Sequence, residues 1–436
     1  MQVRFYNARI LTMASGNKIE KGELWTKDDR IVFVGESHDE EKTAEETAMS
    51  ATGWDREIDC RGNLLMPGFK DAHTHSGMTL LRSYADDMPL QDWLTKQVFP
   101  VEARLDAEKI YHLTRLAVLE YLTSGITSIF DMYLTPESVA KACVKMGMRC
   151  VQTGNVNNFS SSVEYMDEMY KELNHTSPLL SYMIGCHAEY TCSEELLRSI
   201  AGLAHKYEAP VFLHVSETEK EVEECKGRYG MTPPVFLDSI GMFDHGGGGY
   251  HCVHMTDEDM DVFEKRGLSV VTNPGSNTKL ASGIAPISEF LKRGINVAIG
   301  TDGPASNNCL DMFREMFLVT GLAKLREKDA SAVPAFEVLK MATVNGAKAM
   351  NLKQCETLEA GMQADIIMID LHQPNMQPLN NIANNIVYSG SKSNVRMTMI
   401  AGSILYEDGK FADWIDADEI YDTADRITRE LCGEND

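Results

Sequence analysis

The strongest chemical signal in the sequence is a pair of histidines, His73 and His75, in the segment DAHTH at positions 71–75. The residues just before them, MPGF at 66–69, form the end of an apolar run. Alternate side chains of a β-strand point to the same face, so a strand here would bring both imidazoles to one side. Two imidazoles at this spacing form a pair of metal ligands.

A third histidine follows a second apolar run, VFLHVSE at 211–217. His214 can complete a set of three imidazole ligands, and Glu217 can act as a base beside a metal-bound water. A further apolar strand at 297–300 leads to the carboxylate of Asp302. Taken alone, His214 could equally be a buried core histidine, and Asp302 a turn residue.

The segment HCVH at 251–254 offers two more histidines. Because His251 and His254 are three residues apart, a strand points them to opposite faces, and at most one can enter the site. Together, three histidines and one aspartate suit a single divalent metal such as zinc or, as a second choice, iron(II). A water on such a metal loses a proton near neutral pH, and Glu217 can then shuttle protons.

These residues fall at the ends of regularly spaced extended segments. Most of the segments are separated by stretches of helical periodicity, such as 106–123 and 193–207. The eight β-like runs are 64–75, 125–132, 149–156, 181–188, 210–217, 250–255, 268–274 and 296–303. Eight alternations of strand and helix predict an α/β fold, a (β/α)8 TIM barrel, with chemistry at the carboxyl ends of its strands. The candidate residues occupy that end of the first, fifth, sixth and eighth runs.

The two ends of the chain have a different pattern, with short β-rich pieces before residue 66 and again at 364–370 and 395–406. They predict a small β-sandwich domain made from both chain ends, which is possible because termini often lie close together. The expected boundaries are 1–66 and 356–436 for the sandwich, including a terminal helix, and 67–355 for the barrel. The glycine run at 246–249 is expected to be a flexible loop that enters the sixth strand.

Composition excludes several classes of partner. The 436 residues include 41 Lys and Arg against 65 Asp and Glu, a net charge of −24, which argues against nucleic acid or an anionic membrane surface. No stretch approaches the roughly 18 apolar residues of a membrane helix, and the first residues lack a secretory pattern. The ten cysteines form no CxxC pair, which predicts reduced, mostly buried thiols and a cytoplasmic protein.

With these motifs identified, the sequence resembles the amidohydrolase superfamily. The resemblance rests on PGF-x-DAHTH, the H-x-x-E pair at 214–217, HCVH, and GTDGPASNN at 300–308. It extends over nearly the whole chain. The stretch 73–105 is similar to the branch that contains the 5′-methylthioadenosine/S-adenosylhomocysteine deaminases and the triazine chlorohydrolases.

The resemblance implies a role for each candidate residue. The residues that would bind the metal are His73, His75, His214 and Asp302. Glu217 and His251, with Asp302, would carry protons and orient the attacking hydroxide. Glu102 would hold ribose hydroxyls, while His187 and Glu217 would contact the base of a small-molecule nucleoside. The resemblance also implies a homo-oligomer, a dimer or larger.

Two departures from the family refine this expectation. Binuclear members use a carboxylated lysine on the fourth strand, and the run 181–188 contains no lysine, which implies one metal ion per chain. Members that accept S-adenosylhomocysteine are expected to carry arginines after the third strand, but residues 150–170 include no basic residue. The implied substrate is therefore adenosine, 5′-deoxyadenosine or 5′-methylthioadenosine, with S-adenosylhomocysteine disfavoured.

Other functions stay open on the sequence alone. The same site could displace chloride or an amine from a triazine, although Asn307 and Asn308 favour the deaminase side. A guanine-type base deaminase would reject ribose, and Glu102 argues against that. A barrel that only binds would lack metal ligands, which are all present here. His187 and Glu189 resemble the H-x-E of cytidine-deaminase zinc sites, but the accompanying P-C-x-x-C is missing from the sequence.

Overall fold

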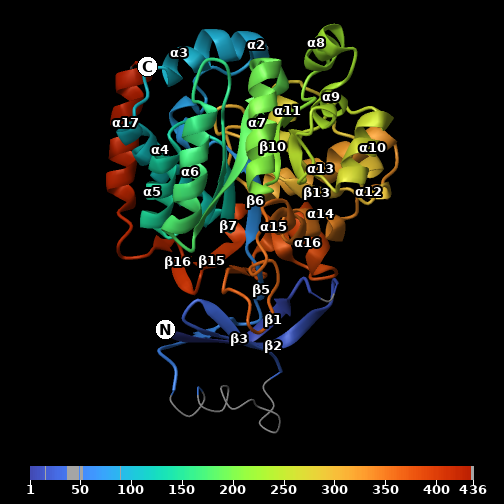
Figure 1. Ribbon diagram of the computed structural model, residues 1–436. Coiled ribbons are helices and arrows are strands. Elements are labelled where there is room, and N and C mark those ends of the chain that lie inside the picture. The colour runs from blue at the N-terminus through green and yellow to red at the C-terminus, as the bar shows by residue number, and fades with distance from the viewer. Residues whose placement is uncertain (15, 37–48, 50–52, 89, 434–436) are drawn as a thin grey trace.

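The computed structural model describes residues 1–14, 16–36, 49, 53–88 and 90–433. Within them the chain forms two β-sheets with helices around one of them (Figure 1). The first sheet has eight parallel strands paired in sequence order. Its strands are β6 (Phe69–Thr74), β7 (Ile126–Asp131), β8 (Arg149–Thr153), β9 (Leu180–Ala188), β10 (Val211–Val215), β11 (Gly247–His251), β12 (Ser269–Thr272) and β13 (Asn296–Ile299).

The sheet curls until its last strand returns to its first. Just beyond β13, the backbone N–H of Asp302 donates a hydrogen bond to the carbonyl of His73 in β6, at 2.9 Å. The main helices outside the strands are α4 (Ala107–Thr123), α5 (Pro136–Met146), α6 (Val163–Thr176), α7 (Glu194–Tyr207), α8 (Glu219–Tyr229), α9 (Pro233–Ser239), α10 (Asp257–Arg266), α11 (Pro274–Lys279), α12 (Ile287–Lys292), α13 (Met312–Glu327), α14 (Ala335–Met341), α15 (Val344–Ala349) and α16 (Ile382–Tyr388). The predicted TIM barrel is confirmed.

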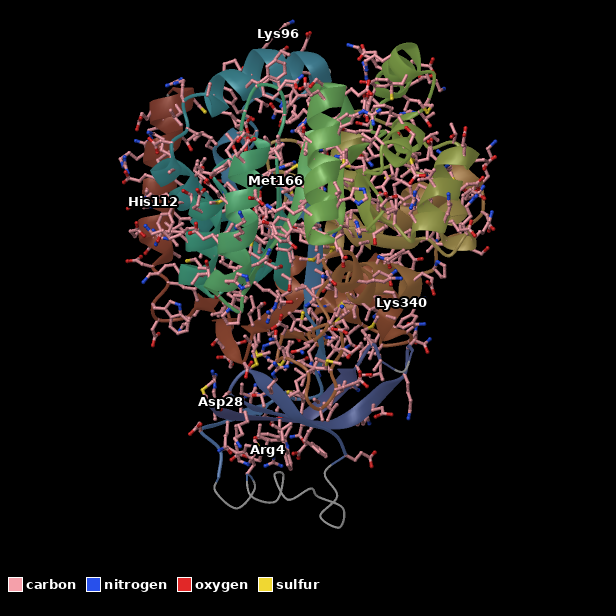
Figure 2. The ribbon with its side chains drawn as sticks, in the orientation of Figure 1. Arg4, Asp28, Lys96, His112, Met166 and Lys340 are labelled. Atoms are coloured by element: carbon pink, nitrogen blue, oxygen red, sulfur yellow. The ribbon has the colours of Figure 1, made fainter. Side chains whose placement is uncertain are left out.

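Helix α7 illustrates why these segments are helical. It begins after Ser193, whose side chain accepts a hydrogen bond from the backbone of Leu196 and so caps the first turn. Its apolar residues recur three and four positions apart and face the barrel, where Leu197 and Ile200 are fully buried. Figure 2 shows the same division across the molecule: Met166 of α6 lies in the interior, whereas Lys96 lies at the surface.

Strands from both chain ends form the second sheet, below the barrel in Figure 1. Its order is β17-β16-β15-β14-β5-β1-β2-β3, and β4 also pairs with β1. The strands are β1 (Gln2–Leu11), β2 (Ile19–Lys27), β3 (Arg30–Gly35), β4 (Arg56–Asp59), β5 (Leu64–Pro67), β14 (Ile366–Ile369), β15 (Val395–Ile400), β16 (Ser403–Glu407) and β17 (Lys410–Phe411). A second β unit made from both ends of the chain is therefore present, as expected.

The run 64–75, predicted as one strand, is divided between the two sheets. β5 pairs with β1 and β14 in the second sheet, whereas β6 begins the barrel. Gly68 separates them, and a Cβ there would lie 2.1 Å from the Cγ2 of Thr127. Only a residue without a side chain fits where the chain passes from one sheet to the other.

The glycine run at 246–249 is a strand, not the flexible loop that the sequence suggested. Gly247, Gly248 and Gly249 belong to β11 and pair with β10. A Cβ on Gly247 would meet the carbonyl of Val211 at 1.9 Å, and one on Gly248 that of Ser269 at 2.2 Å. The glycines are needed because neighbouring backbones approach too closely for side chains.

The terminal helix α17 (Ala417–Cys432) packs on the barrel beside α4, as Figure 1 shows. Its buried residues, Ile420, Ala424 and Ile427, recur at helical spacing. The ten cysteines are free thiols and eight of them are buried. Among the described residues, no helix has the length and apolar character needed to span a membrane.

Candidate active site

Four side chains converge at the carboxyl ends of barrel strands. His73 and His75 come from the end of β6, His214 from β10, and Asp302 from the turn after β13. Nε2 of His75 lies 3.2 Å from Oδ1 of Asp302, and Nε2 of His73 lies 3.6 Å from the same oxygen. One nitrogen each of His73, His75 and His214 lies within 4.8 Å of the others, close enough to share one metal ion.

Backbone carbonyls fix the orientation of two of these imidazoles. Nδ1 of His75 donates to the carbonyl of Met132, and Nδ1 of His214 donates to that of His187 at 2.6 Å. Each bond places a proton on Nδ1 and directs Nε2 at the centre of the cluster. Metal-binding histidines are characteristically held in this way through their second nitrogen.

His73 gives the clearest test of whether the cluster suits a metal. Its side chain is fully buried and stacks on Tyr250, with ring centroids 3.7 Å apart. Neither of its nitrogens has a hydrogen-bond partner among the described residues. An unpaired buried polar atom is costly, so His73 requires a further partner, and three imidazoles with one carboxylate are the donor set of a zinc or iron(II) site. The residues present therefore fit a divalent metal ion.

The electrostatics of the cluster agree with that fit. Burial lowers the pKa values of His73 and His214 well below the ordinary value, which keeps both imidazoles neutral and able to act as ligands. Burial opposes the charge of Asp302, but the hydrogen bond from His75 and the nearby imidazoles hold its pKa well below normal. Burial alone would lower the pKa of His75, but the hydrogen bond and charge of Asp302 raise it to about 9, so an ion would bind in place of a proton on this imidazole.

Glu217 and His251 lie next to this cluster. Nε2 of His251 is 3.9 Å from Oε2 of Glu217 and 3.8 Å from Oδ2 of Asp302. The other histidine of the HCVH segment, His254, bonds to the carbonyl of Ser282 instead. As the spacing predicted, only one of the two enters the site.

The backbone is strained where these groups are presented. Ser216, His251 and Asp302 have φ angles of 50°, 69° and 58°, a region that residues with side chains rarely adopt. Each lies at the end of a barrel strand, beside or at a residue that points into the site. Strained backbone of this kind is typical of functional sites, where the surrounding structure holds it.

Two buried carboxylates that the sequence reasoning missed hold this backbone. Glu221 accepts hydrogen bonds from the backbone N–H groups of Ser216 and Glu217, at 2.8 and 3.0 Å. Asp71 accepts from both the N–H and the hydroxyl of Thr301, directly before Asp302. Thr218-x-x-Glu221 is a capping-box pattern and could have identified the first; Asp71 carried no such signal.

The cluster forms the floor of a cavity of about 660 Å³. Seven of the predicted site residues line it: His75, Glu102, His187, His214, Glu217, His251 and Asp302. His73 lies beneath this floor. The apolar part of the lining comes from α2 (Leu90–Trp93), the π-helical turn η2 (Leu94–Val98), α3 (Phe99–Glu102) and the segments after β7 and β8. Its residues are Trp93, Leu94, Val98, Phe99, Leu134 and Phe159.

The two residues assigned to nucleoside contacts line the cavity from different elements. Glu102 ends α3 near the rim, and burial raises the pKa of its carboxyl to about 7. His187 lies at the end of β9, where its Nδ1 is 3.2 Å from the hydroxyl of Thr191 and burial lowers its pKa to about 4. No lysine or arginine is among the described residues that line the cavity.

Comparison with known proteins gives consistent matches. The model of the amidohydrolase family matches residues 64–405. A 5-methylthioadenosine/S-adenosylhomocysteine deaminase of Caldanaerobacter subterraneus is 38% identical over 99% of both chains. A 5′-deoxyadenosine deaminase of Methanopyrus kandleri is 38% identical over 94% of this chain and 95% of its own. The crystal structure of a Xanthomonas campestris adenosine deaminase with bound zinc superposes with a TM-score of 0.90, at 29% identity, over 99% and 98% of the chains.

Proposed function

The chain belongs to the amidohydrolase family, and we propose that it is a metal-dependent deaminase that hydrolyses the amino group of an adenosine-type nucleoside and releases ammonia. The observation that carries the proposal is one cavity lined by His75, His214, Asp302, Glu217 and Glu102, with His73 buried next to the first three. The names of relatives that share more than a third of their residues with this chain support the same reaction.

His73, His75, His214 and Asp302 would hold one divalent ion, zinc in the first instance and iron(II) as the alternative. When bound, such an ion makes water acidic enough to be a nucleophile near neutral pH. Asp302 has a second free oxygen that faces His251, so it can orient the attacking water while it binds the ion.

Glu217 and His251 provide the proton transfers. Glu217 takes one proton from the water and gives it to a ring nitrogen of the base. The proton of the added hydroxyl then passes to the amino group, which leaves as ammonia while the ring carbon keeps the oxygen as a carbonyl. His251, within 4 Å of both carboxylates, stabilises the oxygen that has added to the ring. His187 contacts the base, and the carboxylate of Glu102 accepts hydrogen bonds from the ribose hydroxyls.

The walls of the cavity favour a neutral substrate. Apart from its histidines, the charged residues in its described lining are the carboxylates Glu102, Glu217 and Asp302, and much of the remaining lining is aromatic or aliphatic. A substrate carboxylate would enter without a cationic partner and would lose its hydration, which is unfavourable. Adenosine, 5′-deoxyadenosine and 5′-methylthioadenosine therefore fit better than S-adenosylhomocysteine.

An ammonia-release assay on zinc-loaded protein tests the function. The substrates are the four nucleosides above, guanine and a chlorotriazine. We expect turnover of the neutral nucleosides, weaker turnover of S-adenosylhomocysteine, and none of guanine or the triazine. Glu217→Gln should lower kcat by about 10²–10⁴-fold at unchanged metal content. Preference for guanine or the triazine would refute the proposal, as would an active Glu217→Gln variant.

The family resemblance also supports a homo-oligomer, a dimer or larger, and the free, mostly buried thiols support a cytoplasmic protein. Sedimentation equilibrium of the purified chain tests the first point, because a dimer has twice the mass of the 48.6 kDa chain. Imaging of a tagged copy in the native cell tests the second.

A further inference from the structure

The loop after β12 supplies none of the metal ligands or proton-transfer groups named above, yet it contacts two of the latter. It runs from Asn273 through α11 to Gly283. Two of its side chains, Asn277 and Ser282, are buried and form hydrogen bonds with His251 and Glu217 respectively. The loop thus reaches both proton-transfer groups at once.

Ser282 contacts one specific oxygen of Glu217. Its hydroxyl donates to Oε1 at 3.1 Å, while the other oxygen, Oε2, faces Nε2 of His251 at 3.9 Å. The bond occupies Oε1 and leaves Oε2 available for the proton that Glu217 carries. It also prevents the carboxylate from rotating away from the metal cluster.

Asn277 does the equivalent for His251. Its Oδ1 lies 2.7 Å from Nδ1 of the imidazole, and because an amide oxygen only accepts, Nδ1 must carry the proton. Nε2 is then free to accept a proton or a hydrogen bond at the site. The bond therefore selects both the ring orientation and the tautomer.

The two residues belong to one rigid unit. The backbone N–H of Ser282 donates to the carbonyl of Asn277 at 2.9 Å. Nε2 of His254 donates to the carbonyl of Ser282 at 2.7 Å, which gives the second histidine of the HCVH segment a structural role. Nζ of Lys279 bonds to the carbonyl of Ala305 at 2.8 Å and so ties the loop to the segment after β13.

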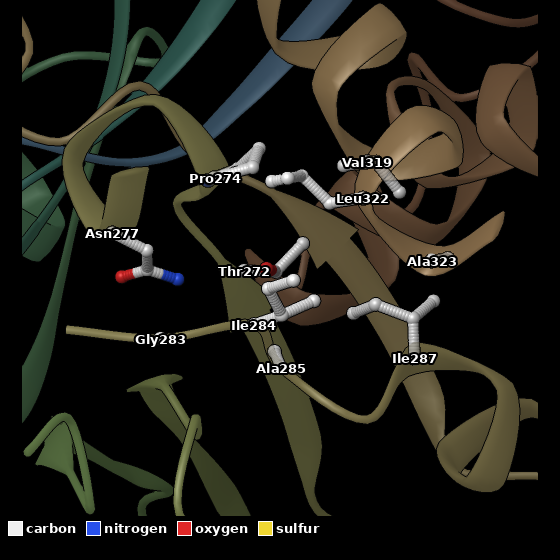
Figure 3. A pocket seen from close by; sticks show the side chains of 10 residues that line it. All are labelled: Thr272, Pro274, Asn277, Gly283, Ile284, Ala285, Ile287, Val319, Leu322 and Ala323. Atoms are coloured by element: carbon white, nitrogen blue, oxygen red, sulfur yellow. The ribbon is translucent and has the colours of Figure 1, made fainter. Parts of the chain in front are cut away.

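The underside of the loop is closely packed. Figure 3 shows Asn277 and Gly283 on one side of a small cavity and Val319, Leu322 and Ala323 of α13 on the other. The cavity measures only about 10 Å³ and is lined mainly by apolar side chains, which leaves no room for the loop to sink. The position of Asn277 and Ser282 is therefore set by the fold before a substrate arrives.

We propose that Ser282 and Asn277 are positioning residues of the deamination: Ser282 directs Oε2 of Glu217 toward the reacting atoms, and Asn277 sets the tautomer of His251. The proposal rests on the proposed function. It assigns no substrate contact to either residue, so their loss should lower kcat and leave KM nearly unchanged.

The test compares two serines of the same loop. Ser276, like Ser282, is buried, but its hydroxyl has no hydrogen-bond partner among the described residues. We expect Ser282→Ala to lower kcat about tenfold with KM within about twofold of wild type, because general acid–base groups depend on their orientation. Ser276→Ala should remain within twofold in both, and Ser282→Thr, which keeps the hydroxyl, should recover most of the loss.

Two substitutions of Asn277 provide an independent arm of the test. Asn277→Leu removes the acceptor for His251 and should lower kcat about tenfold or more, whereas Asn277→Asp keeps an acceptor oxygen and should retain most activity. This arm decides the question if Ser282→Ala does not fold, as judged by thermal unfolding. Equal losses in Ser282→Ala and Ser276→Ala, or in Asn277→Leu and Asn277→Asp, would overturn the proposal.

A wild-type protein that releases no ammonia from any nucleoside would instead refute the proposed function. Crystal structures of Ser282→Ala and Ser276→Ala then test positioning without turnover. The carboxylate of Glu217 should change its orientation in the first and not in the second, and an unmoved carboxylate in the first would refute the positioning role.

Discussion

Two buried polar side chains, one near each end of strand β6, differ in whether they form hydrogen bonds. At its start, the fully buried Lys70 donates from Nζ to the hydroxyl of Thr127 at 2.9 Å. Three residues later, the imidazole of the equally buried His73 has no hydrogen-bond partner among the described residues. Burial alone therefore does not distinguish a structural group from a functional one. What distinguishes them is whether the fold satisfies the group or leaves it for a ligand.

The base of the barrel joins the two sheets. Arg149 of β8 forms two hydrogen bonds, at 2.7 and 2.9 Å, with the buried carboxylate of Asp365, just before β14. Asp365 also accepts from the backbone of Ala401 at 2.8 Å. At the opposite end, the carboxylate of Asp302 faces imidazoles on strained backbone. The ion pair at the base of the barrel stabilises the fold, whereas the groups at the opposite end are arranged as a proposed binding site.

The largest expected effect on activity comes from removing the metal ion or one of the residues proposed to bind it. Removal of the metal by a chelator, or the substitution His73→Ala, should lower kcat/KM by more than about 10³-fold, because the water then loses its activation. Activity and metal content by mass spectrometry are measured together. Zinc should restore the chelated wild type and should fail to restore His73→Ala.

The same experiment bears on stability. Metal binds the folded state only, so zinc should raise the melting temperature of the wild type in a concentration-dependent way. If the chelated wild type kept full activity, the contrast between the two ends would fail, because His73 would then be an unpaired group without a ligand.

The next largest expected effect is a loss of stability, caused by breaking the ion pair at the base of the barrel. Arg149→Met leaves the carboxylate of Asp365 buried without its main partner and should lower the free energy of unfolding by about 3–5 kcal/mol. Activity per folded molecule should be unchanged. Urea denaturation measures the first and a nucleoside assay the second. Arg198→Met, which breaks an exposed pair with Glu194, is the control and should cost less than about 0.5 kcal/mol.

The contrast explains which parts of the molecule the sequence could predict. Strand periodicity predicted the barrel, and the position of polar residues at strand ends predicted that His73, His75, His214, Glu217 and Asp302 would meet at one end of it, since these signals are local. The division of 64–75 at Gly68 was missed because only the approach of Thr127, 59 residues away, requires it. The glycine strand β11 was missed because glycine disfavours strands unless neighbouring backbones crowd it.

The supporting residues were harder to predict than the reacting ones. Asn277 and Ser282 lie in a loop, and their partners, His251 and Glu217, are 26 and 65 residues away in the chain. Neither residue has a type or spacing that marks it as functional. Such contacts depend on tertiary packing, so periodicity and motif spacing cannot reveal them.

A smaller effect tests Glu102, a pocket carboxyl that the fold leaves available for a ligand. Its pKa is raised to about 7 by burial, so it is mostly protonated at pH 6 and mostly ionised at pH 8. If Glu102 binds ribose as proposed, its ionised form accepts hydrogen bonds from two hydroxyls, and KM should therefore fall as the pH rises, up to about tenfold. Steady-state kinetics between pH 6 and 8 measures the change.

Two controls test whether the pH dependence of KM comes from this carboxyl. In Glu102→Gln, KM should be high and independent of pH in this range. A 2′,3′-dideoxynucleoside, which lacks the hydroxyls, should show no pH dependence of KM with the wild type. A pH-dependent KM for the dideoxynucleoside would assign the effect to another group and remove Glu102 from the ribose site.

The smallest expected effect comes from adding a cationic side chain at the rim of the cavity. In the structure, a buried cationic side chain lies instead at the opposite end of the barrel. Phe159 lies on the rim with 89% of its surface exposed, so Phe159→Arg adds a guanidinium without disturbing the core. An exposed ion pair is worth up to about 1 kcal/mol, so S-adenosylhomocysteine should gain roughly threefold in kcat/KM relative to 5′-methylthioadenosine. The gain should fade as salt is added, because exposed charges are screened. Phe159→Gln, polar but neutral, should give no such gain; if it did, apolar contact with the rim rather than the missing cation would be what sets substrate preference.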